Sequence, residues 1–224
     1  MSAATPQEAP RPDLRICFFG DSFVAGVGDS SGLGWVGRVT AAALANGYRL
    51  TSYNLGVRRE TSAQVAARIA GEAAPRLTDA EDARLVVSFG VNDTTQIDGV
   101  ERASVADALR AVRTAVEFAG EGRVLVVGPP ATAERAQNER IRIRDSAMRT
   151  QAAQLGHRFV STFAATLSDE TWQRQIAAGD GYHPDAEGYR LLAEVIEPVF
   201  LAWLTDADLT DAGVPAPLPQ IMLR

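Results

Sequence analysis

Five short apolar runs, each followed by a longer segment of helical or mixed pattern, constrain the fold more than any other feature of this chain. The runs are rich in Ile, Val, Leu and Phe, which is typical of strands buried on both faces of a sheet. They lie at residues 14–19, 48–54, 84–89, 123–127 and 157–161. Strands that alternate with helices pair as a parallel sheet, and right-handed crossovers place helices on both of its faces. We therefore predict an α/β fold with a five-stranded parallel sheet.

Between and after these runs, apolar residues recur at the spacing of helices that pack on a sheet. We predict helices over residues 34–46, 61–69, 104–118, 134–155 and 184–204. Pro75 is expected to close the second helical region, because proline interrupts a helix. Pro184 is expected in the first turn of the last helix. The segment before it, through Trp172 and Ile176, is interpreted as irregular.

The length of 224 residues and the 46% hydrophobic content allow one large core. We expect a single domain over residues 13–204, a polar extension over residues 1–12 and a C-terminal tail over residues 205–224. The tail contains three prolines and no periodicity. It is expected either to wrap along the surface or to be disordered.

The charge and hydropathy of the chain exclude several classes of partner and chemistry. The net charge is −6 and no basic stripe occurs, so nucleic acid and anionic membrane surfaces are poor partners. All 22 basic residues are arginine, which excludes a lysine Schiff base and a Ser-Lys pair. No apolar stretch is long enough to span a membrane, and residues 1–12 do not resemble a secretory signal. We therefore expect a cytoplasmic protein.

The residues that usually hold metals and cofactors are scarce. Cys17, His157 and His183 are the only cysteine and histidines, which is too few for a zinc site, and Cys17 is expected to be a buried hydrophobe. Three glycines in the segment 32–37 match the dinucleotide-binding pattern, but the segment does not directly follow a strand. We expect neither a metal nor a cofactor.

A serine follows the first apolar run, in the sequence Gly20-Asp21-Ser22. Gly20 ends the predicted strand, and Asp21 and Ser22 are both suited to cap a following helix. A hydroxyl there would lie at the carboxyl end of a central strand, where open α/β sheets bind their ligands. These residues alone fit a capped turn as well as a nucleophile.

An acid and a histidine three residues apart supply a candidate base for this serine. His183 lies in a glycine-rich loop before the last predicted helix, and Asp180 could accept a hydrogen bond from its Nδ1. Nε2 would then face the Ser22 hydroxyl. The alternative for this pair is a plain capping loop with His183 at the N-cap.

Three loops could donate hydrogen bonds to an oxyanion. The candidate donors are the backbone N–H of Ser22, the backbone N–H of Gly56, which is expected to be free, and the side-chain amide of Asn92. Each of these residues also fits a simple turn. Because they follow strands whose carboxyl ends meet at one rim, we expect them to converge.

Together, four sequence blocks resemble those of the SGNH hydrolases, also called the GDSL family of lipases and esterases. The blocks are Gly20-Asp21-Ser22-Phe23, Gly56, Gly90-Val91-Asn92-Asp93 and Asp180-Gly181-Tyr182-His183-Pro184. Phe23 stands where the family name has leucine, and the chain lacks the Gly-x-Ser-x-Gly motif of the α/β-hydrolases. The resemblance implies a flavodoxin-like, three-layer α/β/α sandwich, a triad of Ser22, His183 and Asp180, and an oxyanion hole of Ser22, Gly56 and Asn92. Asp21 and Asp93 are interpreted as braces for the turns.

The resemblance implies a serine esterase that hydrolyses carboxylic esters through a covalent acyl-enzyme, with a small-molecule ester as partner. An acyltransferase with an alcohol acceptor fits the same residues, and so does a non-catalytic ligand-binding relative. Short loops between the blocks favour small soluble esters. The oligomeric state is not predicted. Candidate substrate contacts are Phe23, Trp35, Arg58, Thr94 and Tyr182. Arg58 and Arg59 are candidates for binding an anionic group, and they fit solvated charges at the approach to a helix equally well.

Overall fold

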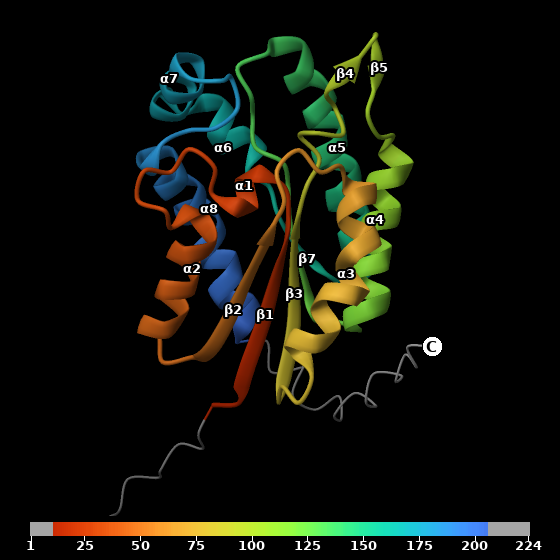
Figure 1. Ribbon diagram of the computed structural model, residues 1–224, viewed down its shortest axis with the longest axis vertical. Helices are drawn as coiled ribbons and strands as arrows, with labels where there is room; N and C mark the ends of the chain where they lie inside the picture. The colour runs from red at the N-terminus through yellow and green to blue at the C-terminus, as the bar shows by residue number, and fades with distance from the viewer. Residues whose placement is uncertain (1–10, 206–224) are drawn as a thin grey trace, which may run out of the picture.

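The computed structural model describes residues 11–205, so nearly all of the predicted N-terminal extension and C-terminal tail lies outside the described residues. The centre of the molecule is a parallel sheet with the strand order β2-β1-β3-β6-β7 (Figure 1). This confirms the predicted α/β fold and the number of strands. The strands are β1 Asp13–Gly20, β2 Arg49–Gly56, β3 Asp82–Ser88, β6 Val124–Val127 and β7 Arg158–Val160.

Helices cover both faces of the sheet, as the pattern of alternating elements predicted. Figure 1 shows α2 and α8 on one side and α3 and α4 on the other. The eight helices of the described residues are α1 Ser22–Ala25, α2 Gly34–Ala45, α3 Ser62–Leu77, α4 Val105–Ala119, α5 Arg135–Gln154, α6 Phe163–Ser168, α7 Glu170–Ala178 and α8 Ala186–Leu204.

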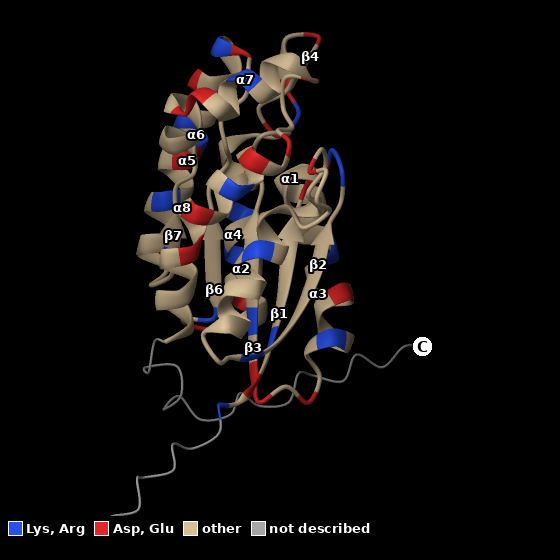
Figure 2. Cartoon of the chain, turned by 90° about the vertical axis from the view of Figure 1, so that its left-hand side faces the viewer, with Lys and Arg blue, Asp and Glu red and all other residues tan. Residues whose placement is uncertain are grey.

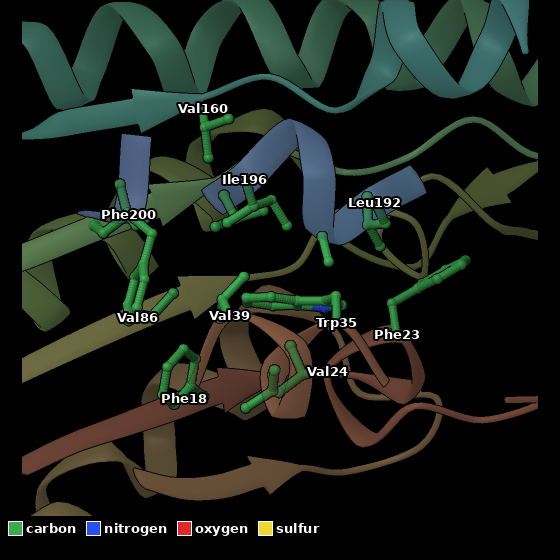
Figure 3. Close-up of a cluster of buried hydrophobic side chains, with 14 of the residues drawn as sticks. Phe18, Phe23, Val24, Trp35, Val39, Val86, Val160, Leu192, Ile196 and Phe200 are labelled. Carbon is green, nitrogen blue, oxygen red and sulfur yellow. The ribbon is translucent and has the colours of Figure 1, made fainter. Parts of the chain in front are cut away.

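Alternate residues of β1 pack into two different cores, because successive side chains of a strand point to opposite faces. Phe18 packs edge-on against Trp35 of α2, with ring centroids 5.8 Å apart, and Phe200 of α8 lies close by (Figure 3). Phe19 belongs to the opposite core, with Ile69 of α3. Each fully buried side chain of this size contributes about 1.5–3 kcal/mol. The two cores therefore bury β1 on both faces, in its position between β2 and β3.

The helical regions differ from the prediction at Pro75, which lies inside α3. A proline within a helix costs about 3 kcal/mol, since it lacks a donor and crowds the preceding turn. Here Leu77 and Ala73 lie on the buried face of α3. Their burial in the core offsets that cost and carries the helix two residues past the proline.

The segment interpreted as irregular is instead helical, as α6 and α7. Trp172 and Ile176 are four residues apart and fully buried, so they form the inner face of α7. The Asp169 carboxylate caps this helix by accepting from the N–H of Trp172 at 2.7 Å. The last helix begins at Ala186 with Asp185 as its N-cap, so Pro184 precedes it and is not in its first turn.

A small hairpin that was not predicted projects at the rim of the sheet (Figure 1). It consists of β4 Gln96–Ile97 and β5 Val100–Glu101, which pair antiparallel. The two turn residues are Asp98 and Gly99, both with positive φ, at 52° and 80°. Asp-Gly between two short strands is a recognised hairpin signal.

Candidate active site

The turn after β1 presents Ser22 at the rim of the sheet. Gly20 is required there, because a Cβ on it would lie 2.2 Å from the Ser88 carbonyl oxygen of β3. Asp21 then caps α1, since its Oδ1 accepts from the N–H of Phe23 at 3.0 Å. As the first residue of α1, Ser22 has a backbone N–H without an acceptor inside the helix. The turn is therefore capped, and it also holds a serine hydroxyl at the rim.

The structure brings Ser22, His183 and Asp180 into one chain of hydrogen bonds. His183 Nε2 lies 2.7 Å from Ser22 Oγ, and His183 Nδ1 lies 2.6 Å from Asp180 Oδ2. The second carboxylate oxygen, Oδ1, accepts from the N–H groups of Tyr182 and His183, both at 2.9 Å. Asp180 therefore shapes the loop and also orients the histidine ring.

The electrostatics of this loop favour an ionised Asp180. Partial burial alone would raise the pKa of the carboxyl, but hydrogen bonds from His183 and Tyr182 outweigh it and lower the pKa to about 2. An acceptor at this position holds the proton of neutral His183 on Nδ1 and leaves Nε2 free to accept from Ser22. The other histidine, His157, is buried beside the Val124 carbonyl, just before β7 and at the opposite end of the strands from this rim.

The side chain of Asn92 is held from both ends. Its Nδ2 donates to Asp21 Oδ2 at 3.0 Å, and its Oδ1 accepts from Arg102 Nη1 at 3.5 Å. Because Asp21 can only accept in its ionised form and Arg102 can only donate, these two partners define which end of the Asn92 amide is the nitrogen. One N–H of Nδ2 remains to donate elsewhere, because the amide nitrogen carries two.

Gly56 fits neither its prediction nor the simple turn that was the alternative for it. Its N–H, expected to be free, donates to Asn54 Oδ1 at 3.0 Å. The reason for a glycine is also not a left-handed turn, since Gly56 is not among the residues with positive φ. A Cβ here would lie 2.2 Å from the backbone nitrogen of Ala25, so the glycine allows β2 to approach α1.

The structure confirms that Asp21 and Asp93 brace the turns. Asp21 holds Asn92 and caps α1, while Asp93 Oδ1 accepts from the N–H of Ser62 at 2.7 Å. Burial raises the pKa of Asp21 to about 7 against its hydrogen bonds, which lower it. Burial likewise raises the pKa of Asp93.

A cavity of about 420 Å³ opens beside the serine. Among the predicted substrate contacts, Phe23, Arg58 and Tyr182 line it. The lining residues come from the loops at the rim and from the hairpin: Ser22, Phe23, Arg58, Arg59, Val91, Asn92, Thr95, Ile97, Arg102, Asp180, Tyr182 and His183.

Two predicted substrate contacts are wrong. Trp35 is 1% exposed and packs in the core between the sheet and α8 (Figure 3), because it lies on the inner face of α2. Thr94 is fully buried, and its hydroxyl donates to the Val91 carbonyl while accepting from Gln137. Thr94 therefore braces the loop, and its neighbour Thr95 lines the cavity.

Four lining residues were not predicted: Val91, Thr95, Ile97 and Arg102. Ile97 belongs to the hairpin and Arg102 follows it. The Asp98-Gly99 pair could have revealed the hairpin, which places both residues near the rim. No local signal in the sequence points to the contact between Arg102 and Asn92.

Residues 11–205 contain no group of three or more His, Cys, Asp and Glu side chains that could hold a metal ion. Within the same range, no helix is both long and apolar enough to cross a membrane.

Comparison with known proteins gives one family and many similar folds. The model of the GDSL-like lipase/acylhydrolase family matches residues 18–191. A lipase/acylhydrolase from Enterococcus faecalis is 24% identical, with a TM-score of 0.70 over 84% of this chain and 95% of that one. A member of the lipolytic protein G-D-S-L family from Veillonella parvula is 20% identical, with a TM-score of 0.67 over 84% and 98%. An acetylxylan esterase from Geobacillus stearothermophilus is 16% identical, with a TM-score of 0.64 over 88% and 96%. No curated protein matches the sequence significantly.

Proposed function

Because this chain belongs to the GDSL-like lipase/acylhydrolase family and is an esterase or acylhydrolase, we propose that it hydrolyses small soluble carboxylic esters with Ser22, His183 and Asp180 as its catalytic triad. The observation that carries the proposal is the chain of hydrogen bonds from Asp180 through His183 to Ser22 Oγ, at 2.6 and 2.7 Å. Both distances are those of close hydrogen bonds, so His183 Nε2 can take the Ser22 proton while the ionised Asp180 orients the ring.

In the first stage, Ser22 Oγ attacks the ester carbonyl carbon and its proton passes to His183 Nε2. The new O–C bond gives a tetrahedral intermediate with a negative oxygen. The bond to the alcohol oxygen then breaks, and His183 returns the proton to the leaving alcohol. Asp180, ionised because its pKa is about 2, stabilises the imidazolium between these two transfers.

In the second stage, water takes the place of the alcohol. His183 accepts a proton from the water, whose oxygen attacks the acyl carbon, and the bond to Ser22 Oγ breaks as the proton returns to the serine. The products are the carboxylic acid and the free enzyme.

The oxyanion of both stages would accept from the Ser22 N–H, the Asn92 side chain and the Gly56 N–H. The first two have a donor available, as described above. Gly56 would have to share its N–H between the oxyanion and Asn54 Oδ1, because that contact is already present. Losing one oxyanion donor typically raises the barrier by about 3–4 kcal/mol. We therefore assign the main stabilisation to Ser22 and Asn92.

The size of the cavity supports small substrates. About 420 Å³ lies at the lower end of the range for small-molecule sites. Since an acetylxylan esterase shares the fold, acetyl esters are the first substrates to test.

The test is the hydrolysis of 4-nitrophenyl acetate by Ser22→Ala. We expect kcat to fall at least about 1,000-fold, because the nucleophile is lost. The circular dichroism spectrum should be unchanged, because the substitution removes only one buried hydroxyl. Ser146→Ala, at an exposed position of α5, is the matched control and should retain full activity. Wild-type activity in Ser22→Ala would show that Ser22 is not the nucleophile.

A further inference from the structure

Three arginines line the cavity beside Ser22, in a chain whose net charge is −6. Arg58 and Arg59 lie in the loop between β2 and α3, which Figure 2 shows as a blue stretch at the rim near α1. Arg102 follows β5. Among the described residues that line the cavity, Asp180 is the one acid. Its carboxylate already forms a hydrogen bond with His183. The cavity is therefore positively charged.

The acids next to these arginines in the sequence are paired with other partners. Glu60 bonds Arg68 of α3 at 2.7 Å, and Glu101 bonds Arg144 of α5 at 2.7 Å. Within residues 11–205, neither Arg58, Arg59 nor Arg102 forms an ion pair. Among the described residues, no carboxylate pairs with the positive charge of these three arginines.

The loop with Arg58 and Arg59 is tied to the site by Arg102. Arg59 has φ of 68°, a left-handed conformation that costs free energy for a residue other than glycine. Its carbonyl accepts from Arg102 Nη2 at 2.9 Å, and Arg102 Nη1 reaches Asn92. This contact holds the two exposed arginines beside the proposed oxyanion donor.

We propose that the arginine cluster, Arg58, Arg59 and Arg102, selects esters that carry an anionic oxygen group such as a carboxylate near the scissile bond. The proposal rests on the proposed function, because it assigns the substrate class of the same cavity. A guanidinium binds a carboxylate through two parallel charge-assisted hydrogen bonds. A concave site of one sign also concentrates oppositely charged substrates. The anionic group could belong to the acid part or to the alcohol part of the ester.

Two matched pairs of substrates separate these possibilities. In the first pair, monoethyl succinate carries the negative charge on the acid part of the ester, and diethyl succinate is the neutral partner. In the second pair, 3-acetoxybenzoate carries the charge on the alcohol part, and its methyl ester is the neutral partner. We expect the anionic ester of at least one pair to have a kcat/KM about tenfold higher at low ionic strength. The preference should shrink as salt is added, since salt screens exposed charges. No preference in either pair would overturn the proposal.

The double variant Arg58→Gln, Arg59→Gln removes two positive charges and leaves shorter, neutral polar side chains that can still form hydrogen bonds. We expect the ratio of anionic to neutral kcat/KM to fall to near one. Arg49→Gln is the matched control, because Arg49 lies exposed at the opposite end of β2 and should leave the ratio unchanged. An unchanged ratio in the double variant would also contradict the proposal.

Binding to Ser22→Ala, measured by calorimetry with the same intact esters, tests the preference without turnover. The anionic ester of the preferred pair should bind more tightly than the neutral one, and the double arginine substitution should remove the difference. If wild type and Ser22→Ala turn over the neutral esters equally, the proposed function fails. In that case the calorimetric comparison is made with the amide analogues N-ethylsuccinamate and N,N′-diethylsuccinamide, which an esterase does not readily hydrolyse, and it still decides whether the cavity prefers anions.

Discussion

Asp21 links the nucleophile turn to the side chain of Asn92. One carboxylate oxygen caps α1, and the other accepts from Asn92 Nδ2 at 3.0 Å. Both contacts favour the ionised form, but burial disfavours it more strongly, and the nearby Asp93 adds repulsion. The result is a pKa raised to about 7. Asp21 thus places a carboxyl group with a pKa near neutral pH next to the proposed nucleophile, Ser22.

The pKa of Asp21 predicts how stability changes with pH. In the unfolded chain an aspartate titrates near 3.9, below the folded value of about 7. As pH rises from about 4 to about 7, the unfolded chain therefore loses this proton first. The contribution of Asp21 to the free energy of unfolding should fall over this window and be constant above it.

Urea unfolding of wild type and Asp21→Asn between pH 4 and 8 measures this contribution, because other carboxylates titrate in both proteins. We expect the stability of the wild type relative to Asp21→Asn to decrease from pH 4 to pH 7. A relative stability that is constant or rises over this window would mean that Asp21 has an ordinary or lowered pKa.

At the scale of the elements, the close approach of β2 to α1 sets the geometry of the rim. Gly56 ends β2, and its Cα faces the backbone of Ala25. Asn54 adds a second connection, because its Nδ2 donates to the Val24 carbonyl at 2.7 Å. The strand therefore holds the short helix that begins with Ser22.

Gly56→Ala tests this packing. The added Cβ would meet Ala25 N at 2.2 Å and the Asp21 carbonyl oxygen at 2.8 Å, so α1 must shift. We expect a loss of about 1–3 kcal/mol in the free energy of unfolding and a fall in kcat for 4-nitrophenyl acetate.

Gly71→Ala is the matched control for this change. Gly71 lies exposed in α3 with open space around its Cα, so alanine should stabilise the protein by about 0.5–1 kcal/mol and leave activity unchanged. Equal stabilities of the two variants would show that the rim tolerates a Cβ at position 56.

At the scale of the molecule, the site depends on segments that lie far apart in the sequence. Ser22 and His183 are separated by 161 residues in the sequence. They meet because the carboxyl end of β1 and the loop before α8 lie at the same rim of the sheet. The three tryptophans report on this arrangement. Trp35, Trp172 and Trp203 are each at most 1% exposed and belong to one core cluster, which also contains Phe23 beside Ser22.

We therefore expect activity, tryptophan fluorescence and far-UV circular dichroism to be lost at the same urea concentration. A common core that includes the residues around the nucleophile should unfold cooperatively. Measuring all three signals in one urea series checks this. Loss of activity at a clearly lower concentration would show that the rim opens before the core unfolds.

Much of the fold and part of the site followed from the sequence, because their signals are local. The apolar runs identified the strands, and the spacing of Asp180 and His183 placed an acid and a base in one loop. The same reasoning failed for Pro75 and for α7. In both cases, the buried side chains of the helix determined the outcome, and their burial depends on neighbouring elements.

The sequence by itself determined the α/β alternation, the turn that carries Ser22 and the candidate base with its partner, since each rests on periodicity or on residues a few positions apart. Only the tertiary structure decided that Trp35 and Thr94 are buried, that the Gly56 N–H already has a partner, and that Arg102 reaches Asn92. The physical reason is that burial and hydrogen-bond partners depend on elements brought together by folding. Spacing along the chain does not encode these contacts.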